Sequence, residues 1–143
     1  IDWQLFTKSE KDKVSIEHIF PQSPTKKEWP AFFKQGVTKN HSLYQGLLGN
    51  LLPLSMSINS SLQNESFDSK KKPKYNEKKV KIRQGYYDGS HSEIEVSRHK
   101  EWTPNQIVER SLNLIKFMDT RWNIKFENEQ AMRVLVTYDS NKL

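Results

Sequence analysis

The first regular pattern of apolar and polar residues runs through KVSIEHIF, residues 13–20. Val14, Ile16 and, less cleanly, His18 fall on one side of an extended chain, because successive side chains of a strand point to opposite faces. Pro21 follows and ends the run. The pattern therefore predicts a short strand that stops just after His18.

A second apolar run, GNLLPLSMS at residues 49–57, comes after a glycine turn and predicts another short strand. Pro53 has no backbone N–H, so we expect this strand at the edge of a sheet. Between the two strands, residues 22–49 contain several glycines and prolines. They predict a long irregular connection, with one helical turn near EWPAFFKQ. A loop of this length in a compact domain is often functional.

Helix signals follow the second strand and return later in the chain. Ser55 or Ser57 is a suitable N-cap for a helix that opens directly after the strand. The strongest helix begins with Thr103 as its N-cap and Pro104 at its first position. Its apolar stripe recurs at spacings of 4, 3, 3 and 4 and consists of Val108, Leu112, Ile115, Met118 and Trp122.

Length and composition fit a single α+β domain. The 143 residues suffice for one hydrophobic core, and two segments, 93–102 and 131–138, fit either a strand or a helix. The chain has no cysteine, which excludes a disulfide framework, a cysteine-rich zinc site and a thiol nucleophile and fits a cytoplasmic location. No apolar run approaches the ~20 residues of a membrane span. Because the first residue is Ile1, we expect the chain to be part of a longer one.

Positive charge is concentrated in one segment. Residues 70–83, KKKPKYNEKKVKIR, hold eight basic residues and one acidic residue, a formal charge of +7. The whole chain carries +6, so the remainder sums to −1. A focused basic segment suits a polyanion such as nucleic acid. A solvated helix face or a flexible lysine run is the alternative.

Glu17, His18 and Asn59 are candidates for phosphodiester hydrolysis. This reaction needs a base for the attacking water, and imidazole titrates near neutral pH. It also needs a cation beside the phosphate, and Mg²⁺ prefers oxygen ligands such as carboxylate and amide groups. Taken singly, a histidine beside a carboxylate is more often structural or exposed, and an asparagine near a helix start commonly bonds to the backbone. The chain contains neither a GxxxxGK[ST] nor a GxSxG motif.

Two motifs together resemble the core of the HNH, or His-Me finger, endonucleases. These are EHIFPQS at 17–23 and GNLLPLSMSIN at 49–59, in which Asn50 and Asn59 are nine positions apart, as in the family pattern. Three further features extend the likeness to the DUF1524 branch over about residues 14–122. They are the lysines that follow the two motifs, the segment GSHSEIEV, and the spaced residues that begin at Trp102. That branch occurs as the C-terminal domain of GmrSD-type, modification-dependent restriction enzymes.

The resemblance implies a ββα-metal (His-Me finger) core with additional packed helices. It makes His18 the general base and gives Glu17 and Asn59 the task of holding a divalent metal, Mg²⁺ first and Mn²⁺ second. Asn50 would orient the loop that carries His18. Many HNH enzymes have aspartate at the position of Glu17. Direct ligation of the metal by Glu17 is therefore the one point that the resemblance does not decide.

The resemblance also places contacts with the DNA backbone on the basic run and on the long helix. The expected residues are Lys70, Lys71, Lys72, Lys74 and Arg110. Leu62 stands where many HNH motifs have a lysine, so Lys70 or a neighbour takes that role in the prediction. For Arg110, bracing the site and a surface salt bridge are alternatives to a phosphate contact.

We therefore expect residues 1–143 to form one HNH-like nuclease domain, with its core at about 14–70 and a helical extension at about 71–143. The expected function is metal-dependent cleavage of DNA in a phage-defence or modification-dependent restriction system. By the resemblance, partners are DNA, including modified phage DNA, and an N-terminal DUF262-like domain of the parent enzyme; no membrane partner is expected. A nucleic-acid-binding module with a decayed active site and an RNase with the same core are the competing interpretations.

Overall fold

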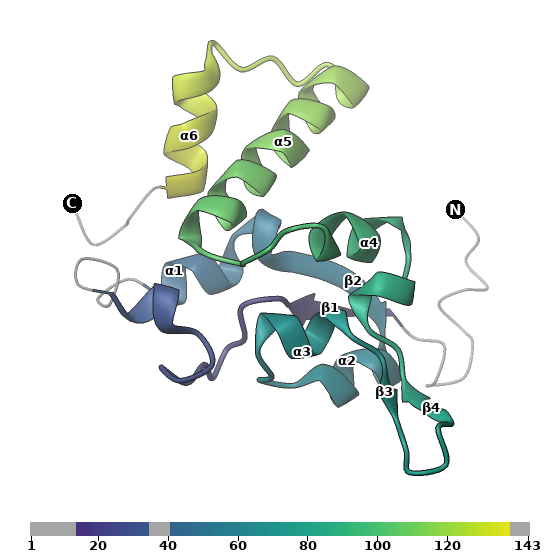
Figure 1. The fold of residues 1–143 in the computed structure, drawn as a ribbon. Helices are drawn as coiled ribbons and strands as arrows, with labels where there is room; N and C mark the ends of the chain where they lie inside the picture. Colours follow the sequence, from purple (N-terminus) through teal and green to yellow (C-terminus); the bar gives the residue numbers. More distant parts are fainter. Residues whose placement is uncertain (1–13, 35–40, 138–143) are drawn as a thin grey trace.

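The computed structural model describes residues 14–34 and 41–137, and these form an α+β arrangement with two small antiparallel sheets (Figure 1). In chain order the elements are β1 (Val14–His18), the 3-10 helix η3 (Pro30–Phe33), α1 (His41–Gly46), η4 (Leu48–Asn50), β2 (Leu51–Ser55), α2 (Met56–Leu62), α3 (Phe67–Lys71), β3 (Lys74–Tyr75), β4 (Lys81–Arg83), η5 (Tyr86–Asp88), α4 (His91–Ser97), α5 (Pro104–Trp122) and α6 (Glu129–Thr137). The mixed fold class is as predicted.

The first sheet pairs the two predicted strands. β1 and β2 are antiparallel, with His18 opposite Leu51 and Ile16 opposite Pro53. The side of β1 that carries its apolar residues is the outer one, because Val14 is 70% exposed and Ile16 53% exposed. The buried residue of the strand is Glu17. Alternation therefore predicted the strand correctly but not which residue of it lies inside.

α2 continues from β2 without a loop. Ser55, one of the two predicted N-caps, precedes the helix in an extended backbone conformation. The helix packs against both strands of the sheet, and its last residue, Leu62, is fully buried. The chain thus presents the order strand, long connection, strand, helix, and the helix lies directly against the sheet.

The main core lies around this unit. It consists of Ile19, Phe20, Trp29, Phe32, Leu52, Leu54, Leu62, Phe67, Tyr86, Val96, Trp102 and Ile107. A second cluster joins α5 to α6 through Leu112, Met132 and Val136. In Figure 1, α5 and α6 stand above the β1–β2 sheet, and α2 and α3 lie below it. None of the described helices is both long and apolar enough to cross a membrane.

α5 begins as predicted. Part of its predicted stripe, Val108, Leu112 and Ile115, packs in the cluster shared with α6, and a second face contacts η4. Thr103 is its N-cap, and the Gln106 side chain accepts a hydrogen bond from the Thr103 backbone N–H. Of the predicted stripe, Leu112 is buried, whereas Trp122 is 59% exposed. The face that contacts η4 carries Arg110 and Ser111, both buried. Polar residues occupy this face because it bonds to backbone groups of η4 and β2, which apolar periodicity cannot indicate.

The segments left open by the sequence are resolved as follows. Residues 93–97 lie in helix α4, residues 98–102 follow that helix, and residues 131–137 lie in helix α6. The basic run does not form one element: it supplies the end of α3, a break at Pro73, and the hairpin β3–β4. This hairpin extends away from the body of the molecule in Figure 1.

Candidate functional site

His18, Glu17 and Asn59 line one open pocket of about 300 Å³ at the end of β1. The other lining residues are mostly polar: Ile16, Pro21, Gln22, Ser23, Gln63 and Asn64. Glu17 and His18 point to opposite sides of an ideal strand. Both reach the pocket because β1 ends at His18 and the chain turns there. The structure therefore brings together three of the four residues predicted for catalysis and metal binding, and Asn50 is the one that does not line the pocket.

Asn59 is held by its amide nitrogen. Its Nδ2 donates to Ser15 Oγ at 2.8 Å and to the Ile16 carbonyl oxygen at 3.0 Å. A carbonyl oxygen only accepts, so the branch of the amide that faces β1 is the nitrogen. Within residues 14–34 and 41–137, no group donates to the amide oxygen Oδ1. That oxygen is therefore an available ligand.

Glu17 is held by one of its two carboxylate oxygens. Oε1 accepts from Lys70 Nζ at 2.6 Å and from the Tyr86 hydroxyl at 2.9 Å. Lys70 and Tyr86 are fully buried. No described group bonds to Oε2, and the residue lines the pocket. The carboxylate is thus fixed from behind and keeps one oxygen for a ligand.

Burial changes the pKa values of Lys70 and Tyr86, the two partners of Glu17. It lowers the pKa of Lys70 from its usual value, although the Glu17 carboxylate acts in the opposite direction. It raises the pKa of Tyr86 well above its usual value, and the nearby Glu17 charge adds to this shift. The Tyr86 hydroxyl therefore remains a proton donor to Glu17 at any physiological pH. Sequence reasoning missed this hydrogen bond, because Glu17 and Tyr86 lie 69 positions apart.

The turn after His18 is fixed by backbone bonds. Lys70 Nζ also donates to the carbonyl oxygens of His18 and Ile19, at 3.0 and 3.2 Å. The Ile19 N–H donates to the Asn50 carbonyl oxygen at 3.0 Å. The imidazole of His18 is half-buried and, among the described residues, has no hydrogen-bond partner. The backbone of the predicted base is therefore constrained while its ring is left available.

Asn50 lies behind the site and is fully buried. Its Oδ1 accepts from the Phe20 backbone N–H at 2.7 Å and from Trp102 Nε1 at 3.3 Å. Its Nδ2 donates to the carbonyl oxygens of Phe20 and Gln45, at 2.9 and 3.1 Å. One amide thus ties the segment after His18 to the long connection and to the start of α5. This is the geometry that the predicted orienting role requires.

Arg110 braces β2 from behind. Its Nη1 donates to the carbonyl oxygens of Gly49 and Leu51, at 2.8 and 3.1 Å, and its Nε to Glu95 at 3.2 Å. The guanidinium is buried. This position does not suit the predicted contact with DNA. It corresponds instead to the bracing role that was weighed as its alternative.

Gly49 and Ser111 form a contact that sequence reasoning missed. Ser111 Oγ accepts from the Gly49 N–H at 2.8 Å and donates to the Ile107 carbonyl oxygen at 2.8 Å. A Cβ on residue 49 would lie 2.1 Å from that same carbonyl oxygen. The glycine immediately before Asn50 was the available signal, because close backbone approach requires glycine.

The four predicted DNA-contacting lysines separate into two pairs. Lys70 and Lys71 are buried, so neither presents its charge to solvent. Lys72 is exposed, and Lys74 is about half exposed and forms an ion pair with Glu65. The first pair therefore does not suit a contact with DNA, whereas the second pair does. Two further exposed lysines, at 78 and 79, belong to the same basic run.

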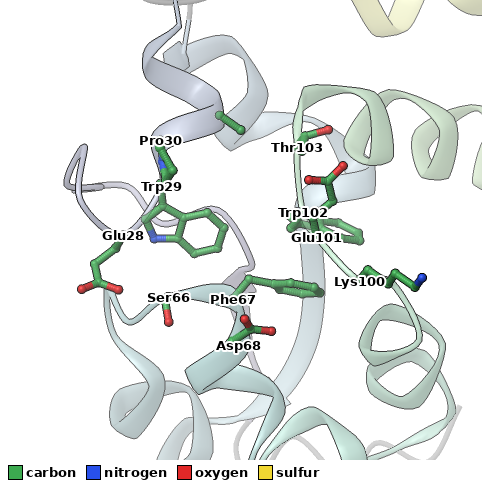
Figure 2. A pocket seen from close by; sticks show the side chains of 11 residues that line it. Glu28, Trp29, Pro30, Ser66, Phe67, Asp68, Lys100, Glu101, Trp102 and Thr103 are labelled. Carbon is green, nitrogen blue, oxygen red and sulfur yellow. The ribbon is translucent and has the colours of Figure 1, made fainter.

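A second pocket, of about 250 Å³, lies elsewhere in the molecule (Figure 2). Its walls are aromatic: Trp29 stands on one side, and Phe67 and Trp102 are stacked on the other, with ring centroids 5.4 Å apart. None of the residues predicted for catalysis or metal binding lines it. The aromatic side chains belong to the main core, so we assign the chemistry to the pocket at the end of β1.

The oxygen ligands of the pocket at the end of β1 fit a hard divalent cation. Within the described ranges, no three histidine, cysteine or acidic side chains gather closely enough to hold a metal by themselves. The unbonded oxygens, Glu17 Oε2 and Asn59 Oδ1, belong to the class of ligands that Mg²⁺ takes in proteins, where water and substrate phosphate complete the coordination. A zinc site would need a different set of ligands.

Comparison with known proteins gives one family. No curated protein and no solved structure matches the chain. The model of the C-terminal domain of GmrSD restriction endonucleases matches residues 2–117, which include the whole pocket at the end of β1 and the bracing residues of α5. The chain therefore belongs to the family of GmrSD restriction endonuclease C-terminal domains, and its role is that of a nuclease of the restriction-endonuclease type.

Proposed function

We propose that this domain is a metal-dependent DNA endonuclease of the HNH type, with His18 as its general base. One observation carries the proposal: the unbonded ring of His18, the Oε2 oxygen of Glu17 and the amide oxygen of Asn59 belong to residues that line the same pocket. The order β1, β2, α2 supports a ββα-metal core, because Asn59 lies on a helix packed against both strands.

The chain's own residues have distinct tasks in this mechanism. The His18 imidazole removes a proton from water as the water oxygen bonds to phosphorus, and the bond from phosphorus to the leaving oxygen breaks. Glu17 Oε2 and Asn59 Oδ1 would hold the cation, Mg²⁺ or Mn²⁺. A divalent cation bound there supplies charge that stabilises the phosphate and the leaving oxygen. Lys70, Tyr86 and Asn50 position the other groups and do not touch the substrate.

Exposed lysines of the basic run supply the contact with the DNA backbone in this proposal. Lys72 and Lys74 take that role, and Lys70, Lys71 and Arg110 do not, because all three are buried. Contacts with phosphates release counterions, so binding should weaken steeply with salt. We further propose that an N-terminal DUF262-like domain of a parent enzyme is the partner that selects modified phage DNA for cutting.

The test is cleavage of supercoiled plasmid by the purified chain in Mg²⁺, Mn²⁺ or EDTA, analysed on a gel. We expect conversion to nicked or linear DNA with either metal and none in EDTA. His18→Ala should lower the rate on the order of 10²- to 10⁴-fold, because the base is removed. His91→Ala changes an exposed histidine on α4 and should cleave like the unchanged chain.

Two results would contradict the proposal. Cleavage by His18→Ala at the rate of the His91→Ala control would remove His18 as the base. Failure of every variant to cleave in either metal, with DNA affinity retained, would favour the nucleic-acid-binding module with a decayed site. Offering RNA and DNA in one reaction separates the DNase from an RNase with the same core.

A further inference from the structure

The hairpin β3–β4 is a closed, hydrogen-bonded unit. Its turn spans residues 76–80, where the Asn76 N–H donates to the Val80 carbonyl oxygen at 2.9 Å. The Val80 N–H in return donates to Asn76 Oδ1 at 2.9 Å. Lys79 has a φ of 58°, the left-handed conformation that tight hairpin turns use. The tip therefore has a defined shape.

Arg83 fixes the base of the hairpin to the helices beside the candidate site. Its Nη1 donates to the Ser61 carbonyl oxygen at 3.3 Å and to Glu65 Oε2 at 2.7 Å. Its Nη2 donates to the carbonyl oxygens of Ser69 and Lys72, at 2.7 and 3.0 Å. Ser61 belongs to α2, the helix that carries Asn59. The hairpin consequently has a set direction relative to the pocket.

The projecting part of the hairpin exposes both charge and apolar surface. Lys78 and Lys79 are exposed, and their side chains form no ion pair or hydrogen bond with any residue in the described ranges. Three large apolar or aromatic side chains are also exposed on this unit: Tyr75 at 56%, Val80 at 56% and Ile82 at 63%. None of these side chains supports the core, so the fold itself does not explain them.

We propose that the β3–β4 hairpin enters a groove of duplex DNA and sets the position of the duplex relative to the pocket. A two-stranded ribbon fits the major groove, which is about 12 Å wide. Lys78 and Lys79 lie against the phosphates, and Val80 and Ile82 contact the base edges, where apolar side chains meet thymine methyl groups. Charge complementarity selects the partner, because residues 74–83, which form the hairpin, hold five basic residues and one acidic residue. This inference rests on the proposed function for its choice of DNA.

The test measures binding without cleavage. The His18→Ala chain in EDTA is titrated into a fluorescent duplex of about 30 base pairs, and separately into one of its single strands, at several salt concentrations. Lys78→Glu/Lys79→Glu should raise the duplex Kd at least tenfold and reduce the slope of log K against log salt by about 2. Arg121→Glu/Lys125→Glu makes the same charge change in exposed residues at the far end of α5 and should stay within twofold (Figure 1).

A second variant tests the groove itself. Val80→Thr/Ile82→Thr keeps strand propensity and charge, and should raise the duplex Kd several-fold with the salt slope unchanged. The proposal is overturned if the Lys78/Lys79 variant binds like the Arg121/Lys125 control, or if the unchanged hairpin binds no duplex. It is also overturned if Tyr75→Ala abolishes binding of the single strand while duplex affinity stays unaltered by every hairpin variant.

These outcomes are independent of cleavage. A chain that binds duplex through the hairpin but never cuts plasmid refutes the nuclease proposal alone. A chain that cuts plasmid normally with Lys78→Glu/Lys79→Glu refutes the hairpin proposal alone. Thermal melting of each variant confirms folding, and no loss is expected because the substituted side chains are exposed.

Discussion

Lys70–Lys71 and Lys78–Lys79 are the same dipeptide, eight positions apart in one basic run, and they have opposite environments. The Lys70 ammonium is fully buried against Glu17, and that of Lys71 lies 4.7 Å from the centre of the Phe67 ring. Lys78 and Lys79 are exposed at the hairpin turn. The first pair therefore belongs to the interior of the site, and the second pair to the surface around it.

This difference shows that consecutive charged residues in a sequence need not all be exposed to solvent. A buried ammonium is tolerated only where a carboxylate or several acceptors replace water. For Lys70 that carboxylate is Glu17, which lies 53 positions earlier in the chain. For Lys78 and Lys79 no described residue plays that part. Solvent exposure thus follows from distant partners and not from the local composition.

The largest expected difference in stability between the two lysine pairs is at Lys70. Lys70→Met leaves the Glu17 carboxylate buried without its cation and should lower the free energy of unfolding by about 3–5 kcal/mol. Lys78→Met, at an exposed position, should change it by less than about 0.5 kcal/mol. Urea unfolding of both variants measures the difference. Equal effects would contradict the assignment, and adding Glu17→Gln to Lys70→Met should restore most of the loss.

Tyr86 and Tyr87, which follow the basic run, allow the same comparison between a buried and an exposed side chain. Tyr86→Phe removes the hydroxyl that donates to Glu17 and should cost about 1.5–3 kcal/mol, the range for hydrogen bonds to charged groups. Tyr87 is 51% exposed, so Tyr87→Phe is the matched control and should be neutral. Denaturant unfolding of the pair measures the effect. Indistinguishable midpoints would show that the hydroxyl of Tyr86 does not stabilise the fold.

A smaller effect is expected at Lys71. Its amine bonds to Asp68 at 2.9 Å and to the His99 carbonyl oxygen at 3.2 Å, but the Asp68 carboxylate is largely exposed. Lys71→Met keeps the aliphatic stem over the Phe67 ring and should cost only about 1 kcal/mol. Lys72→Met is the exposed control. A loss at Lys71 as large as that at Lys70 would mean that both lysines are equally essential to the interior.

A pH dependence is expected at Glu65, which lies where the buried and exposed parts of the run meet. Burial raises its pKa, but hydrogen bonds from Lys74, Ser69 and Arg83 outweigh this and lower the pKa from 4.5 to about 2. Because the folded pKa is the lower one, this stabilisation is present above pH 4.5 and disappears as the pH falls from 4.5 to 2.

Glu65→Gln measures that contribution. The melting temperature of the unchanged chain should exceed that of the variant at pH 7, and the two should converge as the pH approaches 2. Glu77→Gln removes a charge at the exposed hairpin turn and should leave the melting temperature unaltered throughout. A constant difference between the unchanged chain and Glu65→Gln at every pH would contradict the role of ionisation.

The sequence predicted the elements that local patterns determine. Alternation and Pro21 indicated β1, Ser55 was one of two expected caps for α2, and Thr103 with Pro104 indicated the start of α5. The gathering of Glu17, His18 and Asn59 came from motif spacing and from resemblance to a family. Their chemical roles and the metal remain predictions.

What the sequence did not indicate depends on distant backbone partners. Arg110 fell outside the apolar stripe, yet it is buried because it bonds to carbonyl oxygens 59 and 61 positions earlier. Glu17 lies inside, opposite to the apolar side of its strand, because Lys70 and Tyr86 meet it there. No local period records a hydrogen bond between residues so far apart.

The position of Asn50 has a consequence for the order in which the protein is made. Its side chain joins Phe20, 30 positions earlier, to Trp102, 52 positions later, and the neighbouring Gly49 waits for Ser111, 62 positions later. A nascent chain that has emerged only as far as β2 and α2 still lacks Trp102 and Ser111. The ribosome must therefore release the start of α5 before Asn50 and Gly49 gain all of their partners, so the support behind the candidate site is complete only late in synthesis.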